Sequence, residues 1–264
     1  MMDDRDRTWF EGMSEAYERW LVPTLFVPFA DDLVERVAAH APSDVLELAA
    51  GTGVVTRRLV DRLDAAIVAT DLNPGMLAVG ERLAPGASWR QADATALPFE
   101  DASFDIVVCQ FGVMFFPDKR VAFAEALRVL RPGGAFLFNT WGPVADNTFA
   151  AALTDALDAV FPDDPPTFVA AVPHGYHDHR TVMGDVRAAG FAHGQFASLT
   201  FSSPAALARD VATGFCLGSP LRAALAERGD VDELTGRVAA VMERSLGSAP
   251  VVGALNAGVV EADA

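Results

Sequence analysis

The chain has 264 residues, of which 51% are hydrophobic and 21% are charged, a composition typical of a folded globular protein and not of a disordered one. Its formal net charge of −16 argues against nucleic acid and anionic membrane surfaces as partners, because like charges repel. The two cysteines, Cys109 and Cys216, are far apart in the sequence, so we expect reduced thiols, a cytoplasmic location and no zinc site of the paired-cysteine type.

The N-terminus carries alternating charges with no apolar run behind them, so we expect no signal peptide. No apolar stretch reaches the length of a membrane span. The first half of the chain then alternates short apolar runs with helical patterns, which is typical of βαβ units around a parallel sheet. Five of these runs predict strands, at residues 45–48, 66–70, 88–91, 104–109 and 135–140, of which the first is expected to be buried.

Three helices are predicted between these strands. The first extends to about residue 63, and the second opens with the N-cap Asn73 and the helix-starting Pro74. The third covers residues 119–130 and is followed by Arg131-Pro132-Gly133-Gly134, which predicts a sharp stop.

The pattern changes after about Trp141. Helices are predicted at residues 148–160, at 180–189 and over most of 203–246, with strands at 191–201 and 251–261. The Pro-rich stretch 161–173 has apolar residues on both sides, so we interpret it as a connection within one domain. We therefore predict a single domain over 1–264, with an N-terminal helical part (1–40), a core (41–142) and a C-terminal part (143–264).

A glycine-rich turn follows the first predicted strand. Gly51 and Gly53 would let the backbone come within contact distance of a ligand, and the next helix presents free N–H groups there. A dinucleotide fingerprint requires a third glycine, but Thr56 occupies that position. This departure counts against NAD or FAD as the ligand.

Two acids follow the next two strands. Asp71 ends the second strand, where a carboxylate can accept hydrogen bonds from both ribose hydroxyls. Asp93 follows the third strand, where it could accept from an adenine amino group while the Ala94 N–H donates to the ring. One acid at a strand end is as often an ordinary loop residue, but three such features on successive strands indicate a nucleoside site.

These motifs resemble the donor-binding domain of class I S-adenosylmethionine (SAM)-dependent methyltransferases, particularly the ubiquinone- and menaquinone-type C-methyltransferases. The resemblance covers residues 45–140, and its motifs are segment 45–59, Asp71, Asp93-Ala94 with Leu97-Pro98-Phe99, segment 104–108 and segment 127–134. It implies an α/β fold with a Rossmann-like, mostly parallel seven-stranded sheet and helices on both faces. An N-terminal helix and a helical insertion near the C-terminus would complete this fold.

The resemblance also implies a set of SAM contacts at the carboxyl ends of the strands. They are Glu47, Ala49, Gly51 and Gly53 in and beside the glycine-rich turn, Asp71 for the ribose, Asp93 and Ala94 for the adenine, Gln110 beside the sulfonium, and also Leu72, Met76 and Tyr17. Ala49 departs from the family pattern, in which this position is usually glycine.

The methyl acceptor is less clearly indicated. Gln110-Phe111-Gly112 is not the Asn/Asp-Pro-Pro-aromatic run of amino-methylating DNA enzymes, and it lacks the Asp of metal-dependent catechol-type enzymes. Segment 139–141 supplies no Asp either, so the resemblance predicts no metal.

Three segments are candidates for the walls of the acceptor site, and a fourth stretch for its cap. The apolar segment 111–116, after the fourth strand, is expected either to form the floor of this site or simply to pack in the core. Tyr17 belongs to an aromatic helical pattern in residues 9–29, and in related enzymes such a helix closes over the donor. The alternative is an aromatic stripe that packs the helix on the core. His174 and His177, in a histidine-rich loop, are candidate general bases, although a structural loop is the default interpretation. Stretch 203–246 is expected to form a cap over the acceptor site or an oligomer contact, and its apolar residues favour an apolar acceptor.

We therefore predict an enzyme that transfers the SAM methyl group to a small, apolar or aromatic metabolite and releases S-adenosylhomocysteine (SAH). The oligomeric state stays open, a homodimer included. Three alternatives also stay open: a SAM-binding protein of the same fold with other chemistry or none, an NAD-linked oxidoreductase, and an RNA methyltransferase, which the net charge disfavours.

Overall fold

The computed structural model describes residues 12–204 and 206–264. These residues form two compact units. The sheet unit comprises Phe29–Gly142, Tyr176–Leu199 and Ala257–Ala264. The helical unit comprises residues 12–28, Pro143–Gly175 and Thr200–Asn256 without residue 205. The predicted nucleoside site therefore falls in the sheet unit, and the predicted cap in the helical unit.

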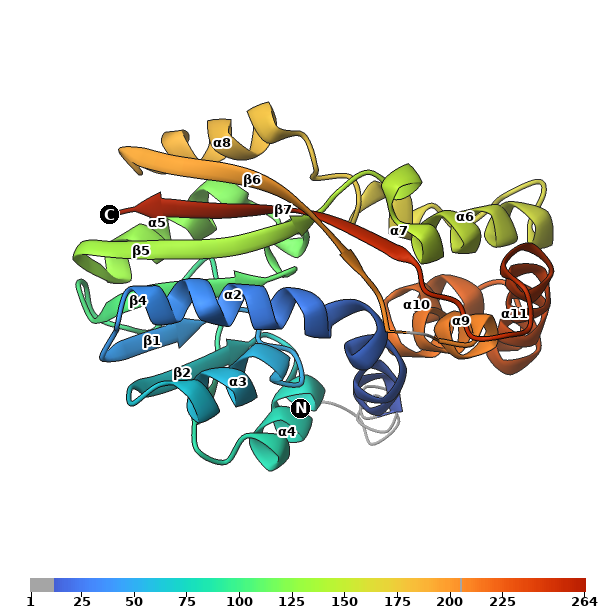
Figure 1. Ribbon diagram of the computed structural model, residues 1–264, viewed down its shortest axis with the longest axis horizontal. Coiled ribbons are helices and arrows are strands. Elements are labelled where there is room, and N and C mark those ends of the chain that lie inside the picture. The colour runs from blue at the N-terminus through green and yellow to red at the C-terminus, as the bar shows by residue number, and fades with distance from the viewer. Residues whose placement is uncertain (1–11, 205) are drawn as a thin grey trace. The chain divides into compact units, whose positions relative to one another are not determined.

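A seven-stranded sheet has the order β3-β2-β1-β4-β5-β7-β6 (Figure 1). Its strands are β1 (Asp44–Glu47), β2 (Ala66–Asp71), β3 (Ser88–Gln91), β4 (Phe104–Gln110), β5 (Leu130–Trp141), β6 (His193–Ser202) and β7 (Ala254–Asp263). Strands β1 to β5 pair in parallel, and β7 pairs antiparallel with β5. The predicted Rossmann-like sheet is thus confirmed, and its strand order reverses between β1 and β4, where such sheets bind ligands.

Helices cover both faces of this sheet. They are α2 (Val27–Ala39), α3 (Val54–Arg62), α4 (Pro74–Leu83), α5 (Lys119–Val129) and α8 (His179–Ala188), with the short 3-10 helix η2 (Val113–Phe115) after β4. In β5, Phe136 and Phe138 contact Phe123 of α5, whereas Trp141 contacts Phe29 of α2. Because side chains alternate along a strand, α2 and α5 lie on opposite faces, as Figure 1 shows.

Local sequence signals set several boundaries in the sheet unit. Helix α4 begins at Pro74 as predicted, and the Asn73 side chain caps it by accepting a 2.8 Å hydrogen bond from the Gly75 N–H. The predicted stop at residues 131–134 is correct for the end of α5 but wrong for the next strand. Residues 131–134 already belong to β5, because Leu130 pairs with Phe104 before the register shifts.

The helical unit is built from α6 (Thr148–Val160), α7 (Phe168–Ala171), α9 (Ala208–Gly218), α10 (Leu221–Ala226), α11 (Val231–Leu246), the π-helix η1 (Tyr17–Phe26) and the 3-10 helix η3 (Val144–Asp146). Helix α9 packs against η1 and α11. A Cβ atom on Gly214 would lie 2.7 Å from the Leu21 side chain, and one on Gly218 would lie 2.6 Å from the Tyr17 nitrogen. Glycine is therefore required for this close approach, and the predicted helices in 203–246 are confirmed.

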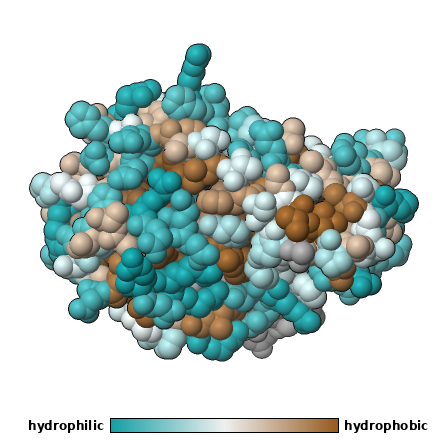
Figure 2. Space-filling model, viewed as in Figure 1, coloured by the Kyte–Doolittle hydropathy of each residue, from teal (hydrophilic) through white to brown (hydrophobic). Residues whose placement is uncertain are grey.

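On the face that Figure 2 draws, hydrophilic side chains of the described residues are interspersed with apolar patches. The exposed large apolar side chains in this part of the chain are Leu72, Leu83, Phe115, Val121 and Val252. Leu72 lies directly after β2, beside Asp71. No helix among residues 12–204 and 206–264 is long and apolar enough to cross a membrane.

Candidate functional site

The turn after β1 has an unusual backbone. Ala49, Gly51 and Gly53 all adopt left-handed conformations, with φ angles of 50°, 57° and 85°. This region costs an L-residue with a Cβ about 1–2 kcal/mol, so Ala49 is strained where glycine would be relaxed. The Gly51 N–H donates a 2.8 Å hydrogen bond to Oδ2 of Asp71, which joins the turn to the end of β2.

Two glycines near this turn have a packing role. A Cβ atom on Gly53 would lie 2.8 Å from the Trp89 ring, and one on Gly80 of α4 would lie 2.3 Å from it. The indole is fixed on these glycines because its Nε1 donates a 3.0 Å hydrogen bond to the Ala84 carbonyl. Gly53 is therefore explained by packing and by its left-handed φ, even without a ligand.

Glu47, at the end of β1, is a buried acid with 1% of its surface exposed. Its pKa is raised to about 8, chiefly by burial and also by the charge of Asp71, while a 2.6 Å hydrogen bond from the Thr56 hydroxyl opposes this rise. Thr56 thus occupies the position where a dinucleotide site has its third glycine, and its side chain is hydrogen-bonded to Glu47. A buried carboxyl of this kind is suited to a cationic partner, which would favour its ionised form.

Asp71 ends β2 and forms two backbone hydrogen bonds. Its two carboxylate oxygens accept from the Gly51 and Asn73 N–H groups, each at 2.8 Å. Burial raises the pKa of Asp71, and these backbone bonds oppose the rise. Leu72 beside it is 64% exposed, and Met76 is half-buried. A carboxylate next to an accessible apolar side chain matches the two chemistries of a nucleoside, the ribose hydroxyls and the flat base.

Asp93 follows β3 and is exposed, whereas Ala94 is half-buried. Oδ1 of Asp93 accepts hydrogen bonds from the N–H and the hydroxyl of Thr95, at 2.8 and 2.7 Å. These bonds lower the pKa of Asp93, so it is ionised at neutral pH. Asp93 therefore also fixes the shape of its own turn.

Gln110 ends β4 and is 9% exposed. It pairs in register with Asn139 of β5. The next residue, Phe111, has a left-handed φ of 50°, and its N–H donates a 2.9 Å hydrogen bond to Oδ1 of Asn139. Its ring stacks on Trp141 with centroids 3.8 Å apart. Asn139 was not predicted as a site residue, although a polar residue inside an apolar strand was a signal that could have identified it.

The sheet register brings the predicted donor residues to one edge. Glu47 pairs with Ala69 of β2 and with Val108 of β4. Asp71 and Gln110 lie two residues beyond these partners, so all three acidic or amide side chains belong to the carboxyl ends of neighbouring strands. Asp93 follows β3, whose last residue Gln91 pairs with Asp71.

The predicted acceptor-side residues are divided between the units. Tyr17 belongs to the helical unit, and its ring centroid lies 5.1 Å from that of Phe26. His174 is buried in the helical unit, whereas His177 is exposed in the sheet unit. Asp178 has a structural role as the N-cap of α8. Among the described residues, no group of three or more His, Cys, Asp or Glu side chains could hold a metal ion.

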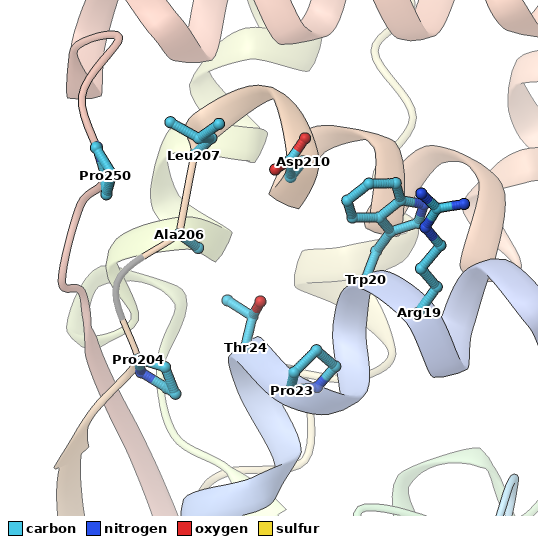
Figure 3. Close-up of a pocket in the computed structure, with 9 residues that line it drawn as sticks. All are labelled: Arg19, Trp20, Pro23, Thr24, Pro204, Ala206, Leu207, Asp210 and Pro250. Carbon is cyan, nitrogen blue, oxygen red and sulfur yellow. The ribbon is translucent and has the colours of Figure 1, made fainter.

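The helical unit contains a cavity of about 300 Å³ (Figure 3). Residues that line it include Trp20, Thr24, Pro204, Leu207, Asp210 and Pro250. The Arg19 guanidinium lies 4.6 Å from the centre of the Trp20 ring. The cavity thus combines aromatic and proline walls with one guanidinium (Arg19), one carboxylate (Asp210) and one hydroxyl (Thr24), which suits a small ligand with both apolar and polar parts.

Known proteins that this chain resembles in sequence are methyltransferases. A family model described as a methyltransferase domain matches residues 46–138. A malonyl-[acyl-carrier protein] O-methyltransferase of Halorhodospira halophila is 33% identical over 216 residues, which are 76% of this chain and 68% of that protein. A demethylmenaquinone methyltransferase of Thermus thermophilus is 33% identical over 56% of this chain and 73% of its own length.

A demethylmenaquinone methyltransferase of Renibacterium salmoninarum is 38% identical over 49% of this chain, and the chain spans about half the length of that relative, 54%. Among solved structures, phosphoethanolamine N-methyltransferase 2 of Haemonchus contortus, in complex with SAH, superposes with a TM-score of 0.61 at 14% identity, over 97% of this chain and 57% of that one. The [4+2]-cyclase SpnF superposes with a TM-score of 0.54 at 18% identity, over 89% and 80% of the two chains. At these identities, the structural matches show the fold alone.

Proposed function

The chain belongs to the class I SAM-dependent methyltransferases, and from this premise we propose that it transfers the methyl group of SAM to a small, apolar or aromatic metabolite. We propose that residues 1–264 work as one methyltransferase domain in the cytoplasm, a compartment that suits the two free, buried cysteines. The observation that carries the proposal is the row of Glu47, Asp71 and Asp93 at the carboxyl ends of β1, β2 and β3.

Each of these acids suits one part of the donor. The buried Glu47 would face the cationic methionyl end, together with Gly51 and Gly53 of the turn. Asp71 would accept from the ribose hydroxyls, with Leu72 and Met76 against the base. Asp93 and Ala94 would contact the adenine edge, and Gln110 would lie beside the sulfonium. Ala49 belongs to the same contact set and is its one departure from the family's usual glycine.

Methyl transfer from a sulfonium requires little catalytic machinery, since the donor is already activated. The enzyme positions the acceptor in line, excludes water and, for an oxygen or nitrogen acceptor, removes a proton. We propose Tyr17 as the residue that contacts donor and acceptor, and His177 or His174 as the proton acceptor. The Trp20 ring and the prolines that line the cavity in the helical unit support an acceptor with an apolar part.

The rival functions predict other binding behaviour. An NAD-linked oxidoreductase is disfavoured because Thr56 binds Glu47 where a dinucleotide site has glycine. A SAM-binding protein without methyl transfer would bind SAM and SAH but would form no SAH from SAM with any acceptor.

The decisive experiment is calorimetric titration of the protein with SAM and with SAH. We expect micromolar binding by the wild type and a loss of at least about tenfold, or 1.4 kcal/mol, in Asp71→Ala. The matched control is Asp64→Ala, an exposed acid of the same unit that should leave binding unchanged. Absence of binding by the wild type would overturn the proposal.

A turnover assay that measures SAH formation then tests the acceptor class. The names of the relatives suggest two panels, reduced quinones and naphthols for carbon acceptors, and carboxylates for oxygen acceptors. Simple aliphatic amines serve as a third, polar panel. Turnover confined to the amines would contradict an apolar or aromatic acceptor.

A further inference from the structure

The exit of β4 shows a strained backbone that two other residues hold in place. Phe111 has a left-handed φ of 50°, a conformation that non-glycine residues adopt rarely and that concentrates at functional sites. The Asn139 side chain accepts a hydrogen bond from the Phe111 N–H, and the Trp141 ring stacks on the Phe111 ring with centroids 3.8 Å apart. Phe29 packs edge-on against both rings, at 5.1 and 5.4 Å.

This strained exit rests directly on the glycine-rich turn. A Cβ atom on Gly112 would lie only 2.5 Å from the Ala49 Cβ, so the backbone of Gly112 is pressed against the Ala49 methyl group. Ala49 is itself left-handed, with φ 50°. A chain of direct contacts therefore links Asn139 through Phe111 and Gly112 to Ala49, two residues before Gly51.

Stability alone does not account for asparagine at position 139. The side chain is fully buried, and among the described residues its Nδ2 has no hydrogen-bond partner. A buried donor without a partner is costly, and leucine would fill a similar volume without that cost. The amide is retained although only its carbonyl oxygen is used, by the Phe111 N–H.

We propose that Asn139 is a positioning residue for the SAM site, which holds Phe111 and Gly112 against Ala49 and so fixes both Gln110 and the glycine-rich turn. The inference rests on the proposed function, because it takes the turn and Gln110 as the donor site. Asn139 acts through the backbone of Phe111 and need not touch the ligand itself.

The test compares SAH affinities by calorimetry, corrected for the folded fraction of each variant. Asn139→Leu removes the acceptor oxygen and should weaken SAH binding by about tenfold or more. Thr140→Val is the matched control, because Thr140 is the next residue of β5, is equally buried, and has an Oγ1 without a partner in the described chain. Its side chain points to the opposite face, so its SAH affinity should stay within about twofold of the wild type.

A second variant keeps the test valid if Asn139→Leu does not fold. Asn139→Asp retains an acceptor oxygen for the Phe111 N–H, and burial should keep its carboxyl neutral at about pH 6. Compared with the wild type at the same pH, SAH binding by Asn139→Asp should be similar at low pH and should become progressively weaker than the wild type as the pH rises and a buried charge forms. Wild-type affinity in Asn139→Leu, or equal losses in Asn139→Asp and Asn139→Leu at low pH, would overturn the proposal. Failure of the wild type to bind SAH would instead overturn the proposed function, before any variant is compared.

Discussion

The Gly51 N–H donates to Oδ2 of Asp71 at 2.8 Å, so the acid at the end of β2 holds the turn that follows β1. The proposed ribose ligand is thus also a structural part of the turn that we propose for the methionyl end. Asp93 differs, because its carboxylate supports only the N–H and hydroxyl of Thr95 in its own turn.

Substitution of either acid should therefore lower SAH affinity, but only substitution of Asp71 should also lower the stability of the protein substantially. We expect Asp71→Ala to lower SAH affinity and also to destabilise the protein by about 1–3 kcal/mol, because two backbone N–H groups lose their acceptor. Asp93→Ala should lower affinity with a stability loss of at most about 1 kcal/mol. Urea denaturation beside calorimetry measures both quantities. Equal stability losses in the two variants would show that Asp71 does not support the turn.

Glu47 should make the stability of the unliganded protein fall as the pH rises. Its pKa is raised from an ordinary value of 4.5 to about 8 in the folded protein, so the folded state binds the extra proton between these values. This contribution is fully present below the lower pKa and is lost as the pH rises through the higher one. In urea denaturation, Glu47→Gln should gain stability relative to the wild type as the pH rises from about 5 to 8. Parallel pH profiles of the two proteins would contradict the raised pKa.

SAM affinity should rise over the same pH range. If the cationic methionyl end binds ionised Glu47, binding must release the proton that Glu47 holds below about pH 8. Affinity should then increase by up to about tenfold per pH unit below that value. Titrations in buffers of different ionisation enthalpy should show release of up to about one proton. Glu47→Gln should bind more weakly and show no such release, and an unchanged release would assign the proton to another group.

The Ala49→Gly substitution should stabilise the protein. Removal of the left-handed strain gains about 1–2 kcal/mol, and the greater chain entropy of glycine offsets about 0.5–1 kcal/mol of it. Ala102 is the control, since it has a φ of 52° on an exposed turn. Both Ala49→Gly and Ala102→Gly should raise the free energy of unfolding, but only Ala49→Gly should alter SAH affinity. A loss of stability in Ala49→Gly alone would mean that methyl packing against Gly112 outweighs the strain.

Alanine substitutions at two helical glycines should change the stability of the protein in opposite directions. In Gly80→Ala, the new Cβ would meet the Trp89 ring at 2.3 Å, and overpacking of this kind costs about 1–3 kcal/mol. In Gly184→Ala, nothing lies within 4 Å of the new Cβ, so the higher helix propensity of alanine should stabilise α8 by about 0.5–1 kcal/mol. Thermal unfolding of both variants checks the packing of Trp89. Stabilisation by Gly80→Ala would show that the indole can move.

Much of the donor half of the fold could be predicted from local signals. The strand at Ser88–Gln91 has the predicted limits, and Asn73 with Pro74 marked the start of α4. Outside the donor half, the helix at Thr148–Val160 also has the predicted limits. Such features depend on hydrophobic period and cap chemistry, which neighbouring residues determine. The glycine-rich turn was predicted from its glycines, which are needed where φ is positive.

Features that depend on distant partners could not be predicted. Strand β5 begins early because Leu130 pairs with Phe104 of β4, and this tertiary contact overrides the local Pro-Gly-Gly signal. The bond from Phe111 to Asn139 and the contact of Trp89 with Gly80 are likewise tertiary contacts. For Tyr17, His174 and His177, the catalytic roles stay predictions, because composition and period do not encode the acceptor.

The position of β7 between β5 and β6 affects how the chain folds during synthesis and how it tolerates truncation. Strand β6 is the edge strand of the sheet, and β7 lies between it and β5. In the sequence, however, α9, α10 and α11 separate β6 from β7. During synthesis, β6 emerges early and must wait without its neighbour, while β5 keeps an open edge that could recruit another chain. A truncation that removes β7 would therefore also leave β6 without a partner strand. Fusions and deletions at this end of the protein should be judged by aggregation during expression before they are judged by activity.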